Sequence, residues 1–183
     1  MKLVRLAAFI GLQSILATGV WAGLHSDASA HEHGHSGSMS AKSGMVEKMP
    51  TANNVVADSC WLRLLHGSAP SAGYFFLRND RQDDIVIVGA AAKAFDEVMV
   101  HQTTQENGMS RMAMVPEIHV GPGQELVFEP GSYHLMLEKP NRQVQVGDTV
   151  EVSVALKSGE KVAVSCEVKP AATTHHHGAA SPH

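Results

Sequence analysis

From Val55 onward, apolar and polar residues alternate in short runs of the kind that form β-strands. The runs are rich in β-branched and aromatic residues and cover residues 55–65, 72–78, 85–88, 95–103, 125–129, 133–137, 149–156 and 161–168. Turn-forming pairs such as Asn107-Gly108 and Pro130-Gly131 lie between them. Because no long helical period interrupts this series, the pattern predicts an all-β fold, an antiparallel β-sandwich or barrel.

The first thirty residues follow the pattern of an export signal. Lys2 and Arg5 give a positive start, and residues 6–21 form an apolar run that is short for a membrane span. Small-x-small cleavage sites end at Ala22 and at Ala30. We therefore predict a signal peptide over residues 1–30, cut after residue 22 or 30, rather than a retained anchor. The mature protein is then expected in the periplasm, with no membrane span.

The alternation is also missing from residues 31–53 and 170–183. Small and polar residues dominate both segments, and neither keeps an apolar period of 2 or 3.6 residues. We expect a disordered leader and a flexible tail on either side of a single domain at residues 54–169.

Composition narrows the range of functions. The chain has 183 residues, a net charge of -4 and 17% charged residues, which gives no reason to expect a nucleic-acid partner. No paired carboxylates or nucleophile–base pair stand out, so we do not expect an enzyme. The outlying counts are twelve histidines and nine methionines. Most of the histidines lie near the two ends; those in the body of the chain are His66, His101, His119 and His134.

The chain has two cysteines, which in an exported protein raises the question of a disulfide. Cys60 falls in the first strand-like run and Cys166 in the last, and the first and last strands of small β-sandwiches often lie side by side. We predict a Cys60–Cys166 bridge, which would stabilise the fold by roughly 4–5 kcal/mol in the chain-entropy model. Two unpaired buried thiols are the alternative that the spacing leaves open.

Two histidines and two methionines form the candidate metal site: His101, Met112, His134 and Met136. Thioether sulfur is a soft ligand, and together with imidazole it favours copper, Cu(I) in particular. His134 and Met136 are two residues apart, so in a strand both side chains leave the same face while Leu135 points to the core.

The turn pair Asn107-Gly108 lets Met112 fold back alongside His101 as the second arm of a hairpin. Four ligands would then come from one hairpin and one further strand. Ordinary packing is the competing interpretation, because a single strand histidine is commonly a hydrogen-bonded surface residue and methionine commonly fills cores. Spacing alone leaves the two interpretations open.

The spacing of these four residues resembles the signature of PCuAC, a family of periplasmic copper chaperones. Ten residues separate His101 from Met112, and twenty-one separate Met112 from the His134-x-Met136 pair. The flanking residues over about 55–168 also agree with the family: Trp61-Leu62-Arg63, Ala72-Gly73-Tyr74 leading to Asn79, Gly108-Met109, and the run PGSYHLML at 130–137.

The resemblance implies a cupredoxin-like (Greek-key) β-sandwich that binds one Cu(I) ion on the four candidate residues. It also implies delivery of that copper toward the subunit of cytochrome c oxidase that carries the Cu(A) centre, often beside a thioredoxin-like copper chaperone. The run Val98-Met99-Val100 departs from the family, in which acidic residues are common near the first ligand. Met99 is thus a candidate substitute or extra ligand, and Met109 and Met114 are candidates for assisting transfer, although adaptable packing is the commoner role.

The histidine-rich ends are candidate secondary Cu(II) sites. A cut after Ala30 makes His33 the third residue of the mature chain, and a cut after Ala22 does the same for His25. A free amine, two backbone amides and a third-position imidazole make the tetragonal chelate that Cu(II) and Ni(II) prefer. A solvated polar tail with incidental affinity is the alternative. The histidines concerned are His25, His31, His33, His35, His175, His176, His177 and His183.

Other functions compete with delivery. A periplasmic copper buffer or resistance protein would use the same core site, and the sequence does not separate the two. A cupredoxin-type electron-transfer protein needs a cysteine ligand beside two histidines, and no histidine follows Cys166 closely. A copper oxygenase with His31 as an N-terminal brace is disfavoured, because some twenty linker residues separate His31 from the first strand-like run.

Overall fold

The structure is a computed structural model, and it describes residues 43–67 and 69–174. The predicted signal peptide, most of the predicted leader and the end of the tail lie outside these residues. So do all the histidines of the proposed secondary sites: His25, His31, His33, His35, His175, His176, His177 and His183.

The described residues form ten strands and one short helix, which confirms the prediction of an all-β fold. The helix is α1 (Ser43–Val46). The strands are β1 (Val55–Arg63), β2 (Ser71–Asn79), β3 (Ile85–Ala92), β4 (Phe95–Glu106), β5 (Met109–Met114), β6 (Ile118–Val120), β7 (Glu125–Phe128), β8 (Tyr133–Pro140), β9 (Thr149–Leu156) and β10 (Lys161–Lys169).

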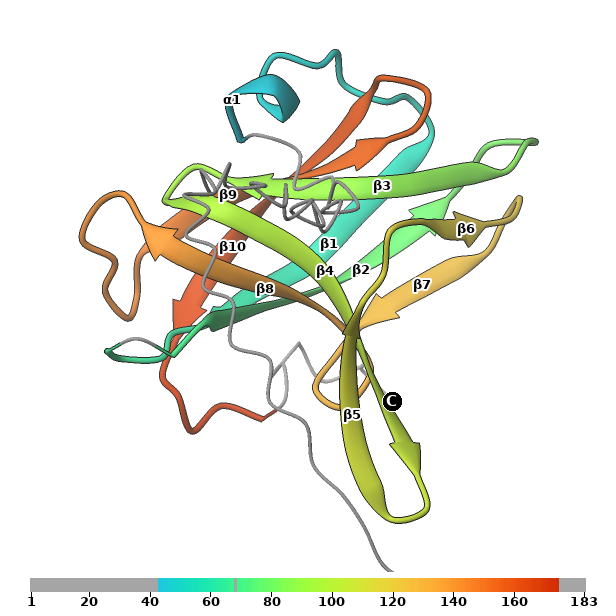
Figure 1. The fold of residues 1–183 in the computed structure, drawn as a ribbon. Helices are drawn as coiled ribbons and strands as arrows, with labels where there is room; N and C mark the ends of the chain where they lie inside the picture. Colours follow the sequence, from blue (N-terminus) through green and yellow to red (C-terminus); the bar gives the residue numbers. More distant parts are fainter. Residues whose placement is uncertain (1–42, 68, 175–183) are drawn as a thin grey trace, which may run out of the picture. The chain divides into compact units, whose positions relative to one another are not determined.

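Backbone pairing closes seven of these strands into a ring (Figure 1). Its order is β4, β8, β2, β1, β10, β9 and β3, and β3 returns to β4 through the Ala92–Phe95 pair. Strands β5, β6 and β7 extend the sheet from β4, β3 and β2. The prediction of an antiparallel sheet is corrected at two places. β1 and β10 are parallel, because the first and last strands enter the ring in the same direction, and the single β7–β8 pair is parallel as well.

The core fills the inside of this ring, and alternation along each strand places it there. Val98 and Val100 of β4 and Leu135 and Leu137 of β8 all point inward and are at most 5% exposed. The residues between them point outward. The sheet therefore has an inner face that supports the fold and an outer face that is free to carry other chemistry.

The predicted Cys60–Cys166 disulfide is present. It joins β1 to β10, and the two Cα atoms are 4.4 Å apart. Both cysteines belong to the buried core. The bridge thus ties together two strands that are 106 residues apart in sequence.

Residues 43–53 correct the prediction that the whole of 31–53 is disordered. Val46 of α1 is fully buried and packs against Ala91 and Ala155. The backbone N–H of Ala52 donates to the carbonyl of Lys161, and the N–H of Lys161 donates to the carbonyl of Pro50. Isolated apolar residues and backbone hydrogen bonds fix this segment, and neither produces a period that a sequence pattern reveals.

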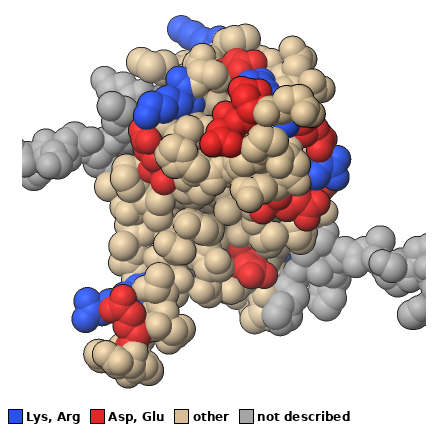
Figure 2. All heavy atoms as spheres, turned by 90° about the vertical axis from the view of Figure 1, so that its right-hand side faces the viewer, with Lys and Arg blue, Asp and Glu red and all other residues tan. Residues whose placement is uncertain are grey.

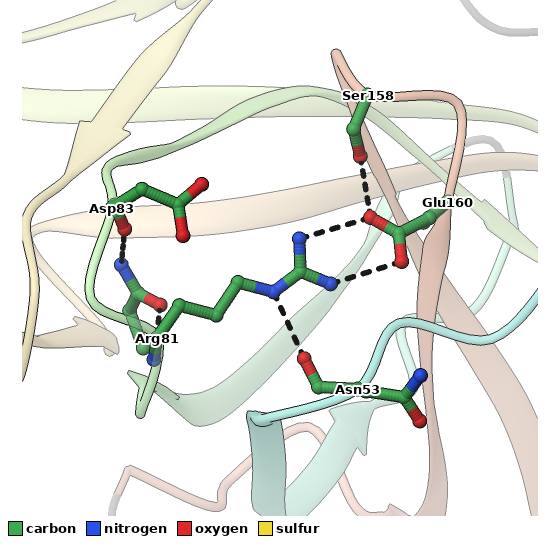
Figure 3. A network of polar contacts seen from close by, with 6 residues as sticks. Asn53, Arg81, Asp83, Ser158 and Glu160 are labelled. Carbon is green, nitrogen blue, oxygen red and sulfur yellow. Dashed lines mark hydrogen bonds and ion pairs between the residues drawn. The ribbon is translucent and has the colours of Figure 1, made fainter.

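A satisfied polar network ties the end of β2 to the β9–β10 turn (Figure 3). The side-chain amide of Asn79, which is fully buried, donates to the carbonyls of Asp83, Val120 and Gly121. The guanidinium of Arg81 donates to both carboxylate oxygens of Glu160 at 2.9 Å, and its Nε donates to the carbonyl of Asn53. The buried amide of Asn79 and the guanidinium of Arg81 therefore both have partners on the protein.

Acidic and basic side chains are mixed on the surface rather than separated. Figure 2 shows them next to one another over the upper part of one face, above an area where charged side chains are few. Among the described residues, no helix is long and apolar enough to cross a membrane.

Candidate metal site

The β4–β5 hairpin brings Met112 back alongside β4, as the turn pair predicted. Glu106 pairs with Met109 across the two-residue loop Asn107-Gly108, and both loop residues have positive φ, 53° and 76°. A two-residue loop with these angles is the type I′ turn that matches strand twist. The hairpin extends beyond the ring of strands (Figure 1), and in its register His101 lies opposite Met114 and Thr103 opposite Met112.

The other pair of candidate residues lies on the neighbouring strand, β8. His134 pairs directly with His101, and Met136 pairs directly with Met99. Directly paired residues share a face of the sheet, and alternation puts Leu135 on the inner face, as predicted. The outer face therefore carries His101, His134, Met136 and Met99 in two adjacent cross-strand pairs, with Met112 reaching in from β5.

The side chain of His134 is oriented with one nitrogen toward a sulfur. Its Nδ1 lies 3.0 Å from the carbonyl oxygen of Ser132, and its Nε2 lies 3.3 Å from Sδ of Met112. A carbonyl oxygen only accepts hydrogen bonds, so Nδ1 carries the proton and Nε2 presents its lone pair toward the sulfur. This arrangement is typical of metal-binding histidines, whose second nitrogen is fixed by a backbone carbonyl.

His101 is buried and stays neutral more readily than an exposed histidine. Its ring centroid lies 6.0 Å from that of His134, and its Nδ1 has no hydrogen-bond partner. Burial lowers the pKa of His101 below its ordinary value, the neighbouring His134 lowers that pKa further, and Glu138 acts weakly in the opposite direction. A neutral imidazole keeps the lone pair that a metal ion needs.

The methionines of the hairpin are exposed, whereas the two histidines are not. The exposed fraction is 59% for Met112 and 43% for Met114, against 9% and 8% for His101 and His134. Met136 is half-buried. The site thus has a fixed imidazole pair at its base and a thioether that solvent and other molecules reach directly.

The donor set suits a soft ion rather than a hard one. No group of three or more His, Cys, Asp or Glu residues within 43–67 and 69–174 is placed to hold a metal. The nitrogen and sulfur atoms on the outer face of β4, β5 and β8 are neutral ligands, which favour Cu(I) over Mg²⁺ or Ca²⁺. The remaining body histidines do not join them; His119 is largely exposed, with Nε2 3.9 Å from a carboxylate oxygen of Glu117.

A cavity of about 370 Å³ adjoins the candidate ligands on the outer face. Met112, His134 and Met136 line it together with Arg63 and Tyr74. Arg63 is a residue that sequence reasoning missed as a functional candidate. It stood in the Trp61-Leu62-Arg63 run, but nothing in the spacing of that run links it to residues seventy positions later.

The family follows from comparison with known proteins. Residues 55–168 match the family described as "Putative lipoprotein LpqE-like". The chain belongs to the LpqE-like family. A relative described as "Putative lipoprotein Lxx21020", from Leifsonia xyli subsp. xyli (strain CTCB07), is 24% identical over 119 residues, which make up 64% of this chain and 71% of that protein.

Solved PCuAC domains share the fold of this LpqE-like chain. The PCuAC domain of PmoF2 gives a TM-score of 0.56 in its apo form and 0.54 in its copper-bound form, at 19% and 18% identity. These matches cover 69% and 67% of this chain and 98% and 97% of that domain. The Cu(I) form of DR1885 from Deinococcus radiodurans gives 0.51 at 28% identity and covers 65% of this chain and 80% of that one. The recognition of a PCuAC-type domain from sequence is confirmed.

Proposed function

We propose that this chain is an exported copper chaperone that holds one Cu(I) ion on His101, Met112, His134 and Met136. In this proposal a cupredoxin-like Greek-key domain carries the ion on its outer face. The observation that carries the proposal is the contact between Nε2 of His134 and Sδ of Met112, next to His101. It joins soft ligands from β4, β5 and β8 on one surface, although packing of the core requires none of them there.

The uneven exposure of the site supports delivery rather than permanent storage. The histidines are buried and fixed, while Met112 is 59% exposed on a hairpin. An acceptor can therefore displace the thioether first and the imidazoles afterwards, so that copper is never released to water. Thiolates in the acceptor bind Cu(I) more strongly than thioethers and supply the driving force. In this scheme Met99, directly paired with Met136, is a substitute ligand.

The acceptor that we propose is the subunit of cytochrome c oxidase that carries Cu(A), with a thioredoxin-like copper chaperone as a further partner. The relatives' names support an exported location, since they describe lipoproteins. The copper-bound forms of PmoF2 and DR1885 support copper as the ion. We place the mature chain in the periplasm.

The C-terminal histidines are proposed to collect Cu(II). Thr174 lines a surface hollow together with Pro130, and Pro130 also lines the cavity beside His134. His175 follows Thr174 directly in the sequence. We propose that copper captured by the tail passes to the core site after a separate one-electron donor, which this chain does not supply, has reduced Cu(II) to Cu(I).

Cu(I) titration and X-ray absorption test the core site. We expect one Cu(I) with mixed nitrogen and sulfur ligands, both in the full mature chain and in a form ending at residue 174. Met112→Ala and Met136→Ala should each reduce the sulfur scattering. Met109→Ala is the matched control, since Met109 is as exposed as Met112 but lies three residues away and so on the other face of β5. Equal losses in Met109→Ala and Met112→Ala would contradict the assignment.

Delivery needs a separate experiment, because a copper buffer has the same site. The loaded protein is mixed with the soluble Cu(A)-carrying fragment of the oxidase subunit, and copper is followed in both proteins after separation. We expect net transfer to the fragment. Retention of all the copper by the donor would favour a buffer or resistance protein.

An electron-transfer role of the blue-copper type has little support. Such a site uses a cysteine thiolate as a copper ligand. The chain has two cysteines, and both are joined in the Cys60–Cys166 bridge. Addition of Cu(II) should therefore give no intense blue colour.

A further inference from the structure

Arg63 lies in the same cross-strand row as the proposed copper ligand Met136. Arg63 of β1 pairs with Ala72 of β2, and Ala72 pairs with Met136 of β8. Two strand spacings of about 4.8 Å each therefore separate the backbones at Arg63 and Met136. The residue between them is an alanine, and its small side chain leaves the space above the row open. The long side chain of Arg63 shares the resulting cavity with Met112, His134 and Met136.

The guanidinium of Arg63 has no anionic partner among the described residues. Its Nε is buried without a hydrogen bond, and none of the ion pairs between described residues includes it. The guanidinium instead lies over the ring of Tyr74, whose centroid is 5.5 Å from Cζ. A guanidinium offers five N–H donors in a fixed fork that matches a carboxylate. A buried donor left unpaired is unfavourable, so an orphan Nε here points to a ligand.

The surroundings of Arg63 fix the kind of ligand. Tyr74 is buried and packs against Trp61, with ring centroids 4.4 Å apart, so an aromatic pair supports the guanidinium. Leu65 and Pro70 add apolar walls, and Ser71 and Thr103 also line the cavity. A carboxylate at the end of a short aliphatic stem fits such a space, with its charge on Arg63 and its stem against the apolar walls.

Copper binding strengthens the need for an anion in this cavity. The four proposed ligands are neutral, so the bound Cu(I) ion keeps a full positive charge beside that of Arg63. We propose that Arg63 forms an anion subsite, which holds an acidic side chain of the protein with which this chain exchanges copper. The inference rests on the proposed function and specifies its partner: a segment that presents a glutamate or aspartate next to its own copper ligands.

Such a subsite links the binding of anion and metal. Because each relieves the repulsion that the other meets, the carboxylate tightens metal binding and the metal tightens carboxylate binding by the same factor. For charges about 8–10 Å apart at a partly exposed site, we expect a factor of about three to ten. The carboxylate thus docks preferentially on loaded protein and leaves when the metal has moved.

The test uses silver(I) nitrate as an air-stable substitute for Cu(I), titrated into the mature chain in chloride-free buffer and followed by calorimetry. Two peptides serve as probes, acetyl-Leu-Glu-Gly-amide and the same peptide with glutamine. In the wild type, we expect the glutamate peptide to tighten silver binding about three- to tenfold and the glutamine peptide to leave it unchanged. In Arg63→Gln, we expect tighter silver binding without peptide, because a positive neighbour is gone, and no response to either peptide. A purely structural role for Arg63 predicts weaker binding.

Two further variants serve as controls. Arg63→Lys keeps the charge but not the fork, so its response to the glutamate peptide should be reduced and not lost. Arg78→Gln removes an arginine from the far end of β2, where Arg78 pairs with Asp80, and should behave as the wild type. The inference is overturned if the glutamate peptide has no effect on the wild type or the same effect on Arg63→Gln.

A metal-free measurement separates this inference from the copper proposal. The NMR signal of the Trp61 indole N–H should shift with the glutamate peptide in the wild type and not in Arg63→Gln. A shift without any silver or Cu(I) binding would retain the anion subsite and reject the copper site. Metal binding with no NMR shift and no effect of the glutamate peptide on metal affinity would retain the copper site and reject the anion subsite.

Discussion

The two ends of strand β2 differ in whether the buried polar side chains near them have hydrogen-bond partners. At one end, the two N–H groups of the buried Asn79 amide are shared among three carbonyls, and Arg81 pairs with Glu160 beside it. At the other end, Ala72 lies between the orphan Nε of Arg63 and Met136, and the buried Nδ1 of His101 is also without a partner. Eight residues of extended chain separate the two ends by roughly 25 Å.

This difference in hydrogen bonding distinguishes the part of the molecule that stabilises the fold from the part that is available to bind a ligand. Proteins rarely leave buried polar atoms unpaired, and a sheet that satisfies its groups fully at one end had the means to do so at the other. The two buried side-chain atoms without partners among the described residues belong to Arg63 and His101. Both lie on the outer face at the proposed copper site, where a bound ligand can provide the partner that the protein itself does not. Four experiments test the contrast.

Removal of the Cys60–Cys166 bridge should have the largest effect, and it should affect both ends. β1 pairs with β2 from Val55–Asn79 to Arg63–Ala72, and the bridge holds β1 against β10 between these points. In the variant with both cysteines changed to alanine, we expect the free energy of unfolding to fall by about 4–5 kcal/mol. Denaturant unfolding measures the loss, and amide hydrogen exchange along β2 should rise at both ends together. A rise confined to one end would contradict the shared scaffold.

Replacement of both His101 and His134 by alanine should abolish copper binding at the Ala72 end of β2 and leave the fold intact. We expect Cu(I) affinity to drop by more than about 100-fold, because even residues that only orient a ligand are worth about 10–100-fold. The free energy of unfolding should fall by about 1–3 kcal/mol, since one hydrogen bond, from His134 to Ser132, and the packing of two buried rings are lost. Competition with a Cu(I) chelator measures the affinity. His119→Ala, at an exposed histidine away from the site, should keep wild-type affinity.

Asn79→Ala should give the converse result at the satisfied end. The substitution leaves three carbonyls without their donor, so the free energy of unfolding should decrease by about 1–3 kcal/mol. Copper affinity should stay within about twofold of wild type, because the two ends are too far apart to share partners. The matched control is Asn141→Ala, which removes one exposed hydrogen bond to Asp96 and should have little effect on stability. A large loss of copper affinity in Asn79→Ala would break the contrast.

The smallest effect concerns pH, and the two ends should respond in different ranges. The pKa of His101 is lowered from its ordinary 6.5, so in metal-free protein the unfolded chain takes up this proton first. The stability from neutral His101 is complete above about 6.5 and is lost as pH falls below it. The pKa of Glu160 is lowered from 4.5 by Arg81 and Ser158, so its stability is present above 4.5 and is lost at lower pH.

Unfolding by urea between pH 7.5 and 5.5 measures the contribution of His101. His101→Ala should show a shallower loss of stability over this range than the wild type. A parallel loss in the two proteins would mean that another group is responsible. Below pH 4.5, His101→Ala and wild type should lose stability alike, whereas Glu160→Gln should lose less.

The sequence predicted most of the sheet because alternation is a local property. All eight predicted runs coincide with strands, and the inward direction of Leu135 and Leu137 followed from period 2. Strands β5 and β6 were absent from the list of runs. The residues of β5, Met109–Met114, are exposed on both faces and show no alternation, and β6 has only three residues. The hairpin was nonetheless anticipated from Asn107-Gly108, since turn chemistry is local as well.

The candidate ligands were found in the sequence by their chemistry and by resemblance, not by their geometry. Two thioethers and two imidazoles are an informative set wherever they occur. Their arrangement depends on the pairing of β4 with β8, which sets His101 against His134 and Met99 against Met136. A shift of one residue in that register would turn one strand's ligands into the core. The sequence of either strand alone does not determine the register.

By itself, then, the sequence determined the fold class and the soft donor set, because strand alternation, turn residues and ligand type are local properties of the chain. The Cys60–Cys166 bridge was predicted from sequence, but the pairing of β1 with β10 decided it. Only the tertiary structure decided which side chains share the outer face and which polar atoms there remain unpaired. Those properties depend on contacts between residues such as Arg63 and Met136, which are far apart along the chain and two strands apart in the sheet. The pairing of β2 with β1 and β8 brings Arg63, Ala72 and Met136 into one row, and so forms the cavity beside the proposed copper site.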